Sequence, residues 1–404
     1  MNNTDIIALH QQFVMNTYVP SIPLVRGKGA RVWDADGGEY LDFLGGIAVV
    51  TVGHCHPGVT KAIRQQAGKL VHVSNLYYNE NQPRLAQLLA ERAALGGAKV
   101  FFGNSGAEAN EGLLKLARLW GHDQGRYEII TMRNSFHGRT LATLTATGQV
   151  KVQKGFEPLP TGFTLADFNN LESVRAAITD KTVAVLTEAV QGEGGILPAT
   201  PEFMQGLRKL CDEKNLLLLC DEVQCGMGRT GKWFGFQHYD VQPDAFSLAK
   251  GLANGYPIGA LVAGPKLANL FQPGHHASTF GGTPLACAAG IATIEAMENE
   301  KCVENATQMS ALFMGLLQKL AKKYSFIQTV RGKGLMIGVI CDRPCKDLEN
   351  LMRAKGLLAL TTNNLIMRFL PPLNITATQV RKAAKLFGAA CAEWQQQLAA
   401  APQA

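Results

Sequence analysis

The chain lacks the patterns that mark disulfide-stabilised or membrane-spanning proteins. Its nine cysteines are an odd number, and the only close pairs, Cys220/Cys225 and Cys341/Cys345, do not have C-x-x-C spacing. Such usage is typical of free thiols in a reducing compartment. No apolar run approaches the ~18 residues needed to cross a bilayer, and the opening MNNTDIIALHQQF does not resemble a signal peptide. We therefore expect a soluble, cytoplasmic protein.

Further absences narrow the class of ligand. The chain has no long run of Lys and Arg and no basic stretch interleaved with aromatics, so nucleic acid is not expected despite a net charge of +7. It also lacks G-x-x-x-x-G-K-[ST], and G-x-G-x-x-G after a strand, which disfavours a nucleotide-binding protein without chemistry. His54, Cys55 and His56 point to alternate faces of an extended segment and have no matching cluster, so no metal site is expected.

Apolar runs that alternate with helical patterns dominate the middle of the chain. From about residue 99 to residue 263 this alternation predicts a mainly parallel sheet with helices on both faces. The predicted strands are 99–102, 126–132, 182–187, 216–220, 244–249 and 259–263.

The flanking segments predict other elements. A hairpin is expected around Asp36-Gly37-Gly38, and residues 150–180 are expected to form a surface excursion that ends in a helix. Helical patterning from 284 continues to about 324. Short strands and helices follow it, which indicates a second, α+β domain.

An acid and a lysine stand at the ends of two of the predicted strands. Asp221 follows the apolar run LLLLC, and Lys250 lies between the small, apolar segments FSLA and GLANG. Open α/β sheets bind their ligands at the carboxyl ends of the strands. A lysine there can hold pyridoxal phosphate as a Schiff base, while a carboxylate keeps the pyridine nitrogen protonated. We therefore expect a pyridoxal-phosphate site in which Lys250 also relays a proton.

Other parts of such a site have candidates elsewhere in the chain. The turn Ser105–Ala107 opens a helix, whose backbone N–H groups predict an anion cradle, although Ser105 also fits a plain helix cap. Phe136 and Val223 are expected on the two faces of the cofactor ring, and Gln224 at its hydroxyl. Arg139 is suited to a bidentate grip on a carboxylate. His137, between them, fits a core histidine better than a direct participant.

Taken together, these segments resemble a known family over nearly the whole chain. The set, in this order and spacing, is similar to the class III (subgroup II) pyridoxal-phosphate aminotransferases. The motifs that carry the resemblance are GHCHP at 53–57, NSGAEANE at 104–111, FHGRT at 136–140, EAVQGEGG at 188–195, CDEVQCGMGRTG at 220–231, LAKGLANGYPIGA at 248–260 and STFGGTPLAC at 278–287.

The resemblance implies the α/β fold of the type I pyridoxal-phosphate transferases. A large domain with a seven-stranded, mainly parallel sheet is expected at 58–295. A smaller α+β domain, built from both chain ends with an N-terminal arm, is expected at 1–57 and 296–404. The resemblance also implies a homodimer with active sites at the subunit interface.

The resemblance assigns the cofactor site residue by residue. Lys250 matches the Schiff-base lysine and Asp221 the partner of the pyridine nitrogen, while Thr279 is expected to reach the phosphate of the neighbouring subunit. The full set implied for pyridoxal 5'-phosphate is Ser105, Gly106, Ala107, Phe136, Asp221, Glu222, Val223, Gln224, Lys250 and Thr279.

The resemblance also implies roles toward the substrates. Arg139 is similar to the arginine that binds the distal carboxylate, and Arg368 to the one that binds the α-carboxylate of glutamate and 2-oxoglutarate. Glu193 is expected to pair with Arg368 when the other substrate is bound, because an unpaired buried guanidinium is costly. Ser278 is expected beside the substrate, and Tyr18 stands where ornithine-specific relatives hold a free α-amine.

The implied activity is a ping-pong transfer of a terminal amino group to 2-oxoglutarate. The resemblance favours acetylornithine or succinylornithine as the donor, and leaves ornithine and 4-aminobutyrate open. A different reaction on the same fold, such as that of an aminomutase or racemase, is disfavoured because two carboxylate-binding arginines suit glutamate.

Overall fold

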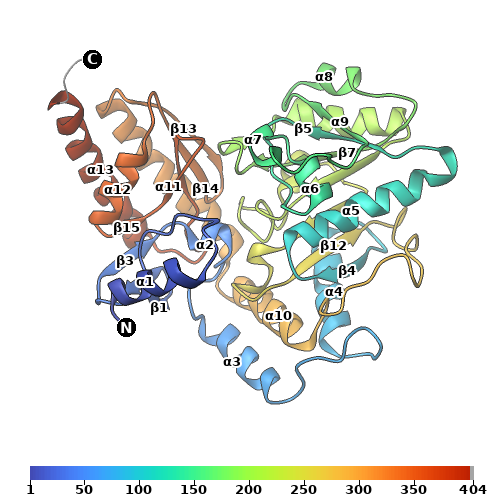
Figure 1. Cartoon of the computed structure of the whole chain (residues 1–404), viewed down its shortest axis with the longest axis horizontal. Helices are drawn as coiled ribbons and strands as arrows, with labels where there is room; N and C mark the ends of the chain where they lie inside the picture. Colours follow the sequence, from blue (N-terminus) through green and yellow to red (C-terminus); the bar gives the residue numbers. More distant parts are fainter. Residues whose placement is uncertain (401–404) are drawn as a thin grey trace.

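The computed structural model describes residues 1–400, and its largest sheet has seven strands (Figure 1). All strands run parallel except β12, which is antiparallel to both of its neighbours. The prediction of a mainly parallel sheet is therefore confirmed. The strand order is β4 (Lys99–Gly103), β12 (Gly259–Ala263), β11 (Ala245–Leu248), β10 (Leu217–Asp221), β7 (Thr182–Glu188), β5 (Glu128–Met132) and β6 (Phe163–Ala166).

The leucine run of β10 is buried on both faces of this sheet. Leu217 and Leu219 belong to the cluster formed with α5 (Gly106–Gly121), whereas Leu218 packs in the cluster that includes α9 (Pro201–Glu213). Successive side chains of a strand point to opposite faces, so only a continuous apolar run satisfies both helix layers. This packing fixes the position of the residue that ends the strand.

Two predictions from the sequence were wrong in detail. Residues 150–180 include strand β6 at the sheet edge, which the Gly- and Pro-rich flanks of this four-residue strand conceal. The helical pattern after Pro284 is two helices, α10 (Pro284–Asn299) and α11 (Cys302–Lys323). They separate at Lys301, which adopts a left-handed conformation with φ 50°. Neither Gly nor Pro marks this break.

One of the two four-stranded sheets joins segments from both ends of the chain. Strand β15 pairs in parallel with β3, so a C-terminal strand completes an N-terminal sheet. The domain limits at 57/58 and 295/296 stay predictions, and residues 401–404 lie outside the described residues. One sheet has the order β1 (Leu24–Lys28), β2 (Arg31–Asp34), β3 (Glu39–Asp42), β15 (Leu357–Leu358); the other has β13 (Ile327–Lys333), β14 (Met336–Cys341), β17 (Ile366–Phe369), β16 (Leu360–Thr362).

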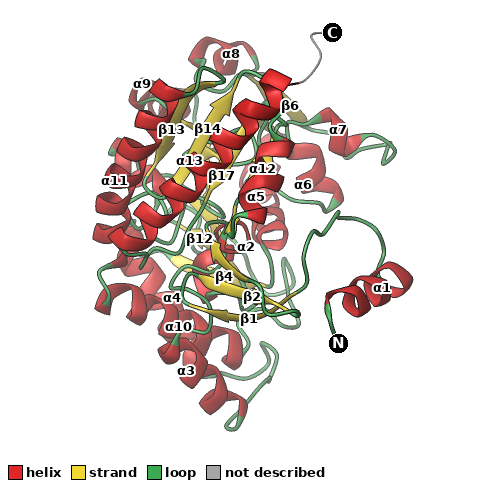
Figure 2. Cartoon of the chain, turned by 90° about the vertical axis from the view of Figure 1, so that its left-hand side faces the viewer, coloured by secondary structure: helices red, strands yellow, loops and turns green. Residues whose placement is uncertain are grey.

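Helix α1 (Asn3–Phe13) stands away from the body of the molecule (Figure 2). None of its residues is buried, although Phe13 and several aliphatic residues lie on it. Helix α3 (Pro57–Ala67) packs on α10, α4 (Asn81–Ala93) on α10 and β4, and α12 (Lys346–Ala354) and α13 (Ala377–Ala400) pack on each other and on β15. Within the described chain, no helix is both long and apolar enough to cross a membrane.

Candidate active site

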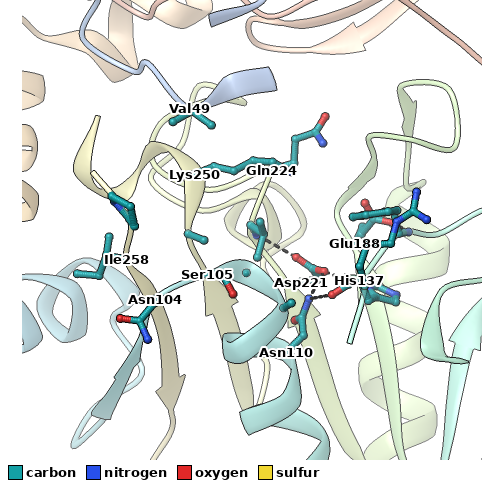
Figure 3. Close-up of a pocket in the computed structure, with 18 of the residues that line it drawn as sticks. Val49, Asn104, Ser105, Asn110, His137, Glu188, Asp221, Gln224, Lys250 and Ile258 are labelled. Atoms are coloured by element: carbon teal, nitrogen blue, oxygen red, sulfur yellow. Dashed lines mark hydrogen bonds and ion pairs between the residues drawn. The ribbon is translucent and has the colours of Figure 1, made fainter. Parts of the chain in front are cut away.

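A cavity of about 380 Å³ opens at the carboxyl ends of the central strands (Figure 3). Strands β4, β7, β10 and β11 each end at or beside it. It brings together nine of the predicted site residues: Ser105, Gly106, Ala107, Phe136, Arg139, Asp221, Val223, Gln224 and Lys250. Residues far apart in the sequence therefore meet where an open α/β sheet is expected to bind its ligand.

Asp221 is held by three hydrogen-bond donors at the end of β10. Its Oδ2 accepts from Asn110 Nδ2 and from His137 Nδ1, each at 2.8 Å, and its Oδ1 accepts from the backbone N–H of Val223 at 2.9 Å. The side chains of Asp221 and His137 are 4 % and 0 % exposed. Donors at this distance stabilise the ionised form of a carboxylate and fix its orientation. Asp221 is therefore a buried, oriented anion.

Lys250 lies two residues after the end of β11 and has a left-handed backbone with φ 42°. A residue with a Cβ in this region typically costs about 1–3 kcal/mol, and such strain clusters at functional sites. Burial lowers the pKa of Lys250, while the charges of Glu193 and Asp221 partly oppose that shift. A lysine with a lowered pKa is better suited to accept and return a proton near neutral pH.

The start of α5 forms an anion cradle on the opposite wall. Ser105 is the N-cap, and its Oγ accepts from the N–H of Glu108 at 3.2 Å. The side chain of Glu108 accepts from the backbone N–H of Asn104, so it does not complete a capping box with Ser105. A Cβ on Gly106 would lie 2.8 Å from Cγ1 of Val223. Glycine therefore keeps the first-turn N–H groups open to the cavity.

These features fit pyridoxal 5'-phosphate. The helix start suits the phosphate and the oriented Asp221 carboxylate suits a protonated pyridine nitrogen. Phe136 lines the cavity and can lie flat against a ring, and the Arg139 guanidinium is 5.5 Å from the centroid of the Phe136 ring. Lys250 supplies the amine for the aldehyde.

Arg368 and Glu193 form an ion pair beside the cavity. The distance from Arg368 Nη1 to Glu193 Oε1 is 2.5 Å, and the two side chains are 1 % and 27 % exposed. Burial alone would raise the pKa of Glu193, but the charge and hydrogen bond of Arg368 outweigh it, and the pKa is lowered. The pairing predicted from the resemblance is thus present in the geometry.

Two neighbours clamp the loop that carries Glu193. Thr362 Oγ1 donates to the backbone carbonyl of Glu193 at 3.2 Å, and Arg331 donates to that of Gly195 from both Nε and Nη2. These donors come from strands β13 and β16, on the other side of the cavity from the seven-stranded sheet. The ion pair therefore depends on both parts of the fold.

Besides Arg368 and Glu193, four predicted site residues do not line the cavity of this single chain. Glu222 points away, and its carboxylate accepts from the N–H groups of Gly235 and Phe236. Its predicted contact with the cofactor has no support in this geometry. The others are partly or fully exposed; Ser278 Oγ accepts from Asn104, which does line the cavity, whereas Thr279 and Tyr18 face solvent.

Three residues of the site were not predicted as members of it. His137 was interpreted as a core histidine, but it holds Asp221. Asn110 lies one turn into α5, on the face toward β10, a position that helical spacing could have revealed. Glu188 ends β7 and lines the cavity, and in the sequence it directly follows the predicted strand 182–187.

Comparisons with known proteins show which family the chain resembles along its length. A family model described as Aminotransferase class-III matches residues 14–391. Acetylornithine aminotransferase of Caldanaerobacter subterraneus subsp. tengcongensis is 48% identical over 388 residues, covering 94% of this chain and 98% of the relative.

Solved structures are similar over the same length. Acetylornithine aminotransferase of Elizabethkingia anophelis has a TM-score of 0.86 at 34% identity, covering 97% of this chain and 100% of the other. Ornithine aminotransferase of Toxoplasma gondii, with PLP at partial occupancy in its active site, has a TM-score of 0.93 at 33% identity, covering 98% and 95%.

The lowered pKa of Glu193 predicts how its ion pair responds to acid. The pair should stabilise the fold above the ordinary glutamate pKa of 4.5, and this stabilisation should be lost as pH falls through the lowered folded-state value. Urea unfolding measured from pH 7 down to pH 3 should therefore show that the free energy of unfolding falls more steeply with pH in wild type than in Glu193→Gln. Equal slopes would contradict the ion pair; Glu202→Gln, an exposed substitution, is the control.

Proposed function

The chain belongs to the class-III aminotransferases, and we propose that it transfers the terminal amino group of N2-acetyl-L-ornithine to 2-oxoglutarate. The products are N-acetyl-L-glutamate 5-semialdehyde and L-glutamate, in arginine biosynthesis. Support comes from relatives named for this donor that align over nearly the whole chain. The observation that carries the proposal is the cavity, where Lys250 and Asp221 lie beside a guanidinium already neutralised by Glu193.

When bound, pyridoxal 5'-phosphate supplies an aldehyde for the amino group and a ring that withdraws electrons from the reacting carbon. Asp221 keeps a proton on the ring nitrogen because it is a buried anion fixed by three donors. Lys250 Nζ removes the proton from the carbon that bears the donor's terminal amine, and it returns a proton in the second half-reaction. Its lowered pKa favours this exchange.

The two arginines divide the recognition of carboxylates. Arg139 is exposed at the cavity and makes no ion pair within residues 1–400, so it is free to bind the far carboxylate of either substrate. Arg368 is buried and paired with Glu193. Acetylornithine leaves this pair intact because it has no carboxylate near its terminal amine. 2-Oxoglutarate presents its α-carboxylate there, and that group takes the place of Glu193 on Arg368.

We propose that the active enzyme is a homodimer. The loop that carries Ser278 and Thr279 is next to exposed apolar side chains, including Tyr77, Tyr78 and Phe280. A second copy covering this surface would explain the exposure, with Thr279 of each subunit reaching the phosphate held by the other. Tyr18, on the exposed arm, would then approach a substrate. We also propose a cytoplasmic location, which suits nine cysteines that the structure leaves as free thiols.

Ornithine is the second candidate donor. Ornithine aminotransferases are among the most similar solved structures, and Tyr18 is present at the position associated with a free α-amine. Succinylornithine and 4-aminobutyrate also carry a terminal amine and a far carboxylate. Comparison of kcat/KM for the four donors with 2-oxoglutarate tests the proposal: acetylornithine should be highest, and a higher value for ornithine would replace it.

Replacement of Lys250 tests the reaction class. Lys250→Ala should abolish transfer from acetylornithine to 2-oxoglutarate, and the visible absorbance of the bound cofactor should be lost with the amine that holds it. Lys209→Ala, on the exposed face of α9, should leave both unchanged. A Lys250→Ala enzyme that still forms glutamate through repeated cycles would refute the assignment.

Kinetics of the two half-reactions should distinguish the role of Arg139 from that of Arg368. Arg139→Gln should raise the KM for acetylornithine and for 2-oxoglutarate, each by about tenfold or more, since a charged hydrogen bond contributes roughly 1.5–3 kcal/mol. The double variant Glu193→Gln/Arg368→Gln should raise the KM for 2-oxoglutarate alone. This pair of substitutions avoids an unpaired buried charge. Equal effects of the double variant on both substrates would contradict the division.

A further inference from the structure

Glu188 is a buried acid that the reaction described above does not use. It ends β7 in direct register with Asp221 at the end of β10, and both residues line the cavity. Neighbouring strands lie about 4.8 Å apart, and paired residues of a parallel ladder point to the same face. Figure 3 shows Glu188 and His137 together on one side of Asp221.

The two carboxyl groups have unequal sets of donors. Asp221 receives three hydrogen bonds at 2.8–2.9 Å, one of them from His137. Glu188 receives two, from the backbone N–H groups of Phe136 at 3.4 Å and Gly192 at 3.3 Å. Shorter and more numerous donors favour the anion. Two buried negative charges side by side would be costly in free energy, so the pair holds one. That charge therefore resides on Asp221.

The positive charges near Glu188 do not stabilise it as a second anion beside Asp221. Asp221 opposes it, and Lys250, the cation that favours it, interacts more strongly with Glu193 and Asp221. Arg368 is occupied by Glu193, and Arg139 is exposed to solvent. Burial and the Asp221 charge together raise the pKa of Glu188 well above its ordinary value.

We propose that Glu188 is an uncharged, proton-bearing acid of the active site, and that it offers its hydroxyl as a hydrogen-bond donor to an oxygen of the bound ligand. The Glu188 carboxyl accepts hydrogen bonds from two backbone N–H groups, and among residues 1–400 its hydroxyl has no acceptor. The cavity that Glu188 lines is where such an acceptor can bind. Its neutrality leaves Asp221 as the anion of this carboxyl pair. The inference rests on the proposed aminotransferase site.

A protonated Glu188 in the folded protein means that the chain takes up one proton at this residue when it folds at pH 7. At pH 7 a glutamate in the unfolded chain is ionised, whereas Glu188 in the folded chain keeps its proton. Unfolding therefore releases one proton from this group, and the stabilisation it gives is lost as pH rises. The unfolding equilibrium constant should rise about tenfold per pH unit from this group alone.

The substitution Glu188→Gln replaces the neutral acid with a neutral amide of the same shape. Urea unfolding of the full chain at pH 7 should release one proton fewer in this variant than in wild type. Glu222, whose pKa burial raises to about 8, is present in both proteins and cancels in the difference. The exposed Glu213→Gln should match wild type. Equal proton release by wild type and Glu188→Gln would overturn the proposal.

A second measurement needs no variant at this position. Infrared difference spectra of wild type with and without pyridoxal phosphate at pH 7 should show the carbonyl band of a protonated carboxyl shift when the ligand binds. A Glu222→Gln protein should retain the shift, because Glu222 lies outside the cavity. Absence of a shifting acid band would contradict the proposal. The measurement of proton release on unfolding uses no cofactor or substrate. It can therefore contradict a protonated Glu188 while the transfer assay supports the aminotransferase, and it can support a protonated Glu188 while the transfer assay fails.

Discussion

The orientation of Asp221 is the constraint on which the rest of the site depends. Its carboxylate lies at the end of a strand that is buried on both faces. Three donors hold it: Asn110 of α5, His137 of the loop after β5, and the N–H of Val223 in the turn that follows the strand. Once this anion is fixed, the other charges follow an order. The positive charge of Lys250 is partly balanced by Asp221, and that of Arg368 is balanced by Glu193. Glu188 remains uncharged. Removal of one group would disturb several partners.

The sequence predicts the large sheet well because its strands are short apolar runs between helical patterns. It misses β6 because an edge strand of four residues has one neighbour and little need for a long apolar run. It joins α10 and α11 because the break at Lys301 carries no Gly or Pro. The pairing of β15 with β3 cannot be read from local sequence either, since Leu357 pairs with Leu41, which is 316 positions earlier in the chain (357 − 41).

Site residues were predictable from the sequence where the residue type and its neighbours in the chain together indicate one chemical role. Lys250 after an apolar strand and the Ser105–Ala107 turn are such cases, and both line the cavity. His137 and Asn110 were not predictable in this way, because their roles arise only when α5 meets β10 in space. The family resemblance supplied Arg368 and Glu193, which local patterns alone do not distinguish from an ordinary surface pair.

The most direct test of this account is the protonation state of the cofactor's ring nitrogen in the assembled enzyme. ¹⁵N NMR of the full-length protein loaded with ring-labelled pyridoxal phosphate should show a protonated nitrogen at neutral pH in wild type. The proton should be lost or weakly held in Asp221→Asn, whose amide cannot act as the anion. An unprotonated ring nitrogen in wild type, or the same signal in both proteins, would contradict the central role of Asp221.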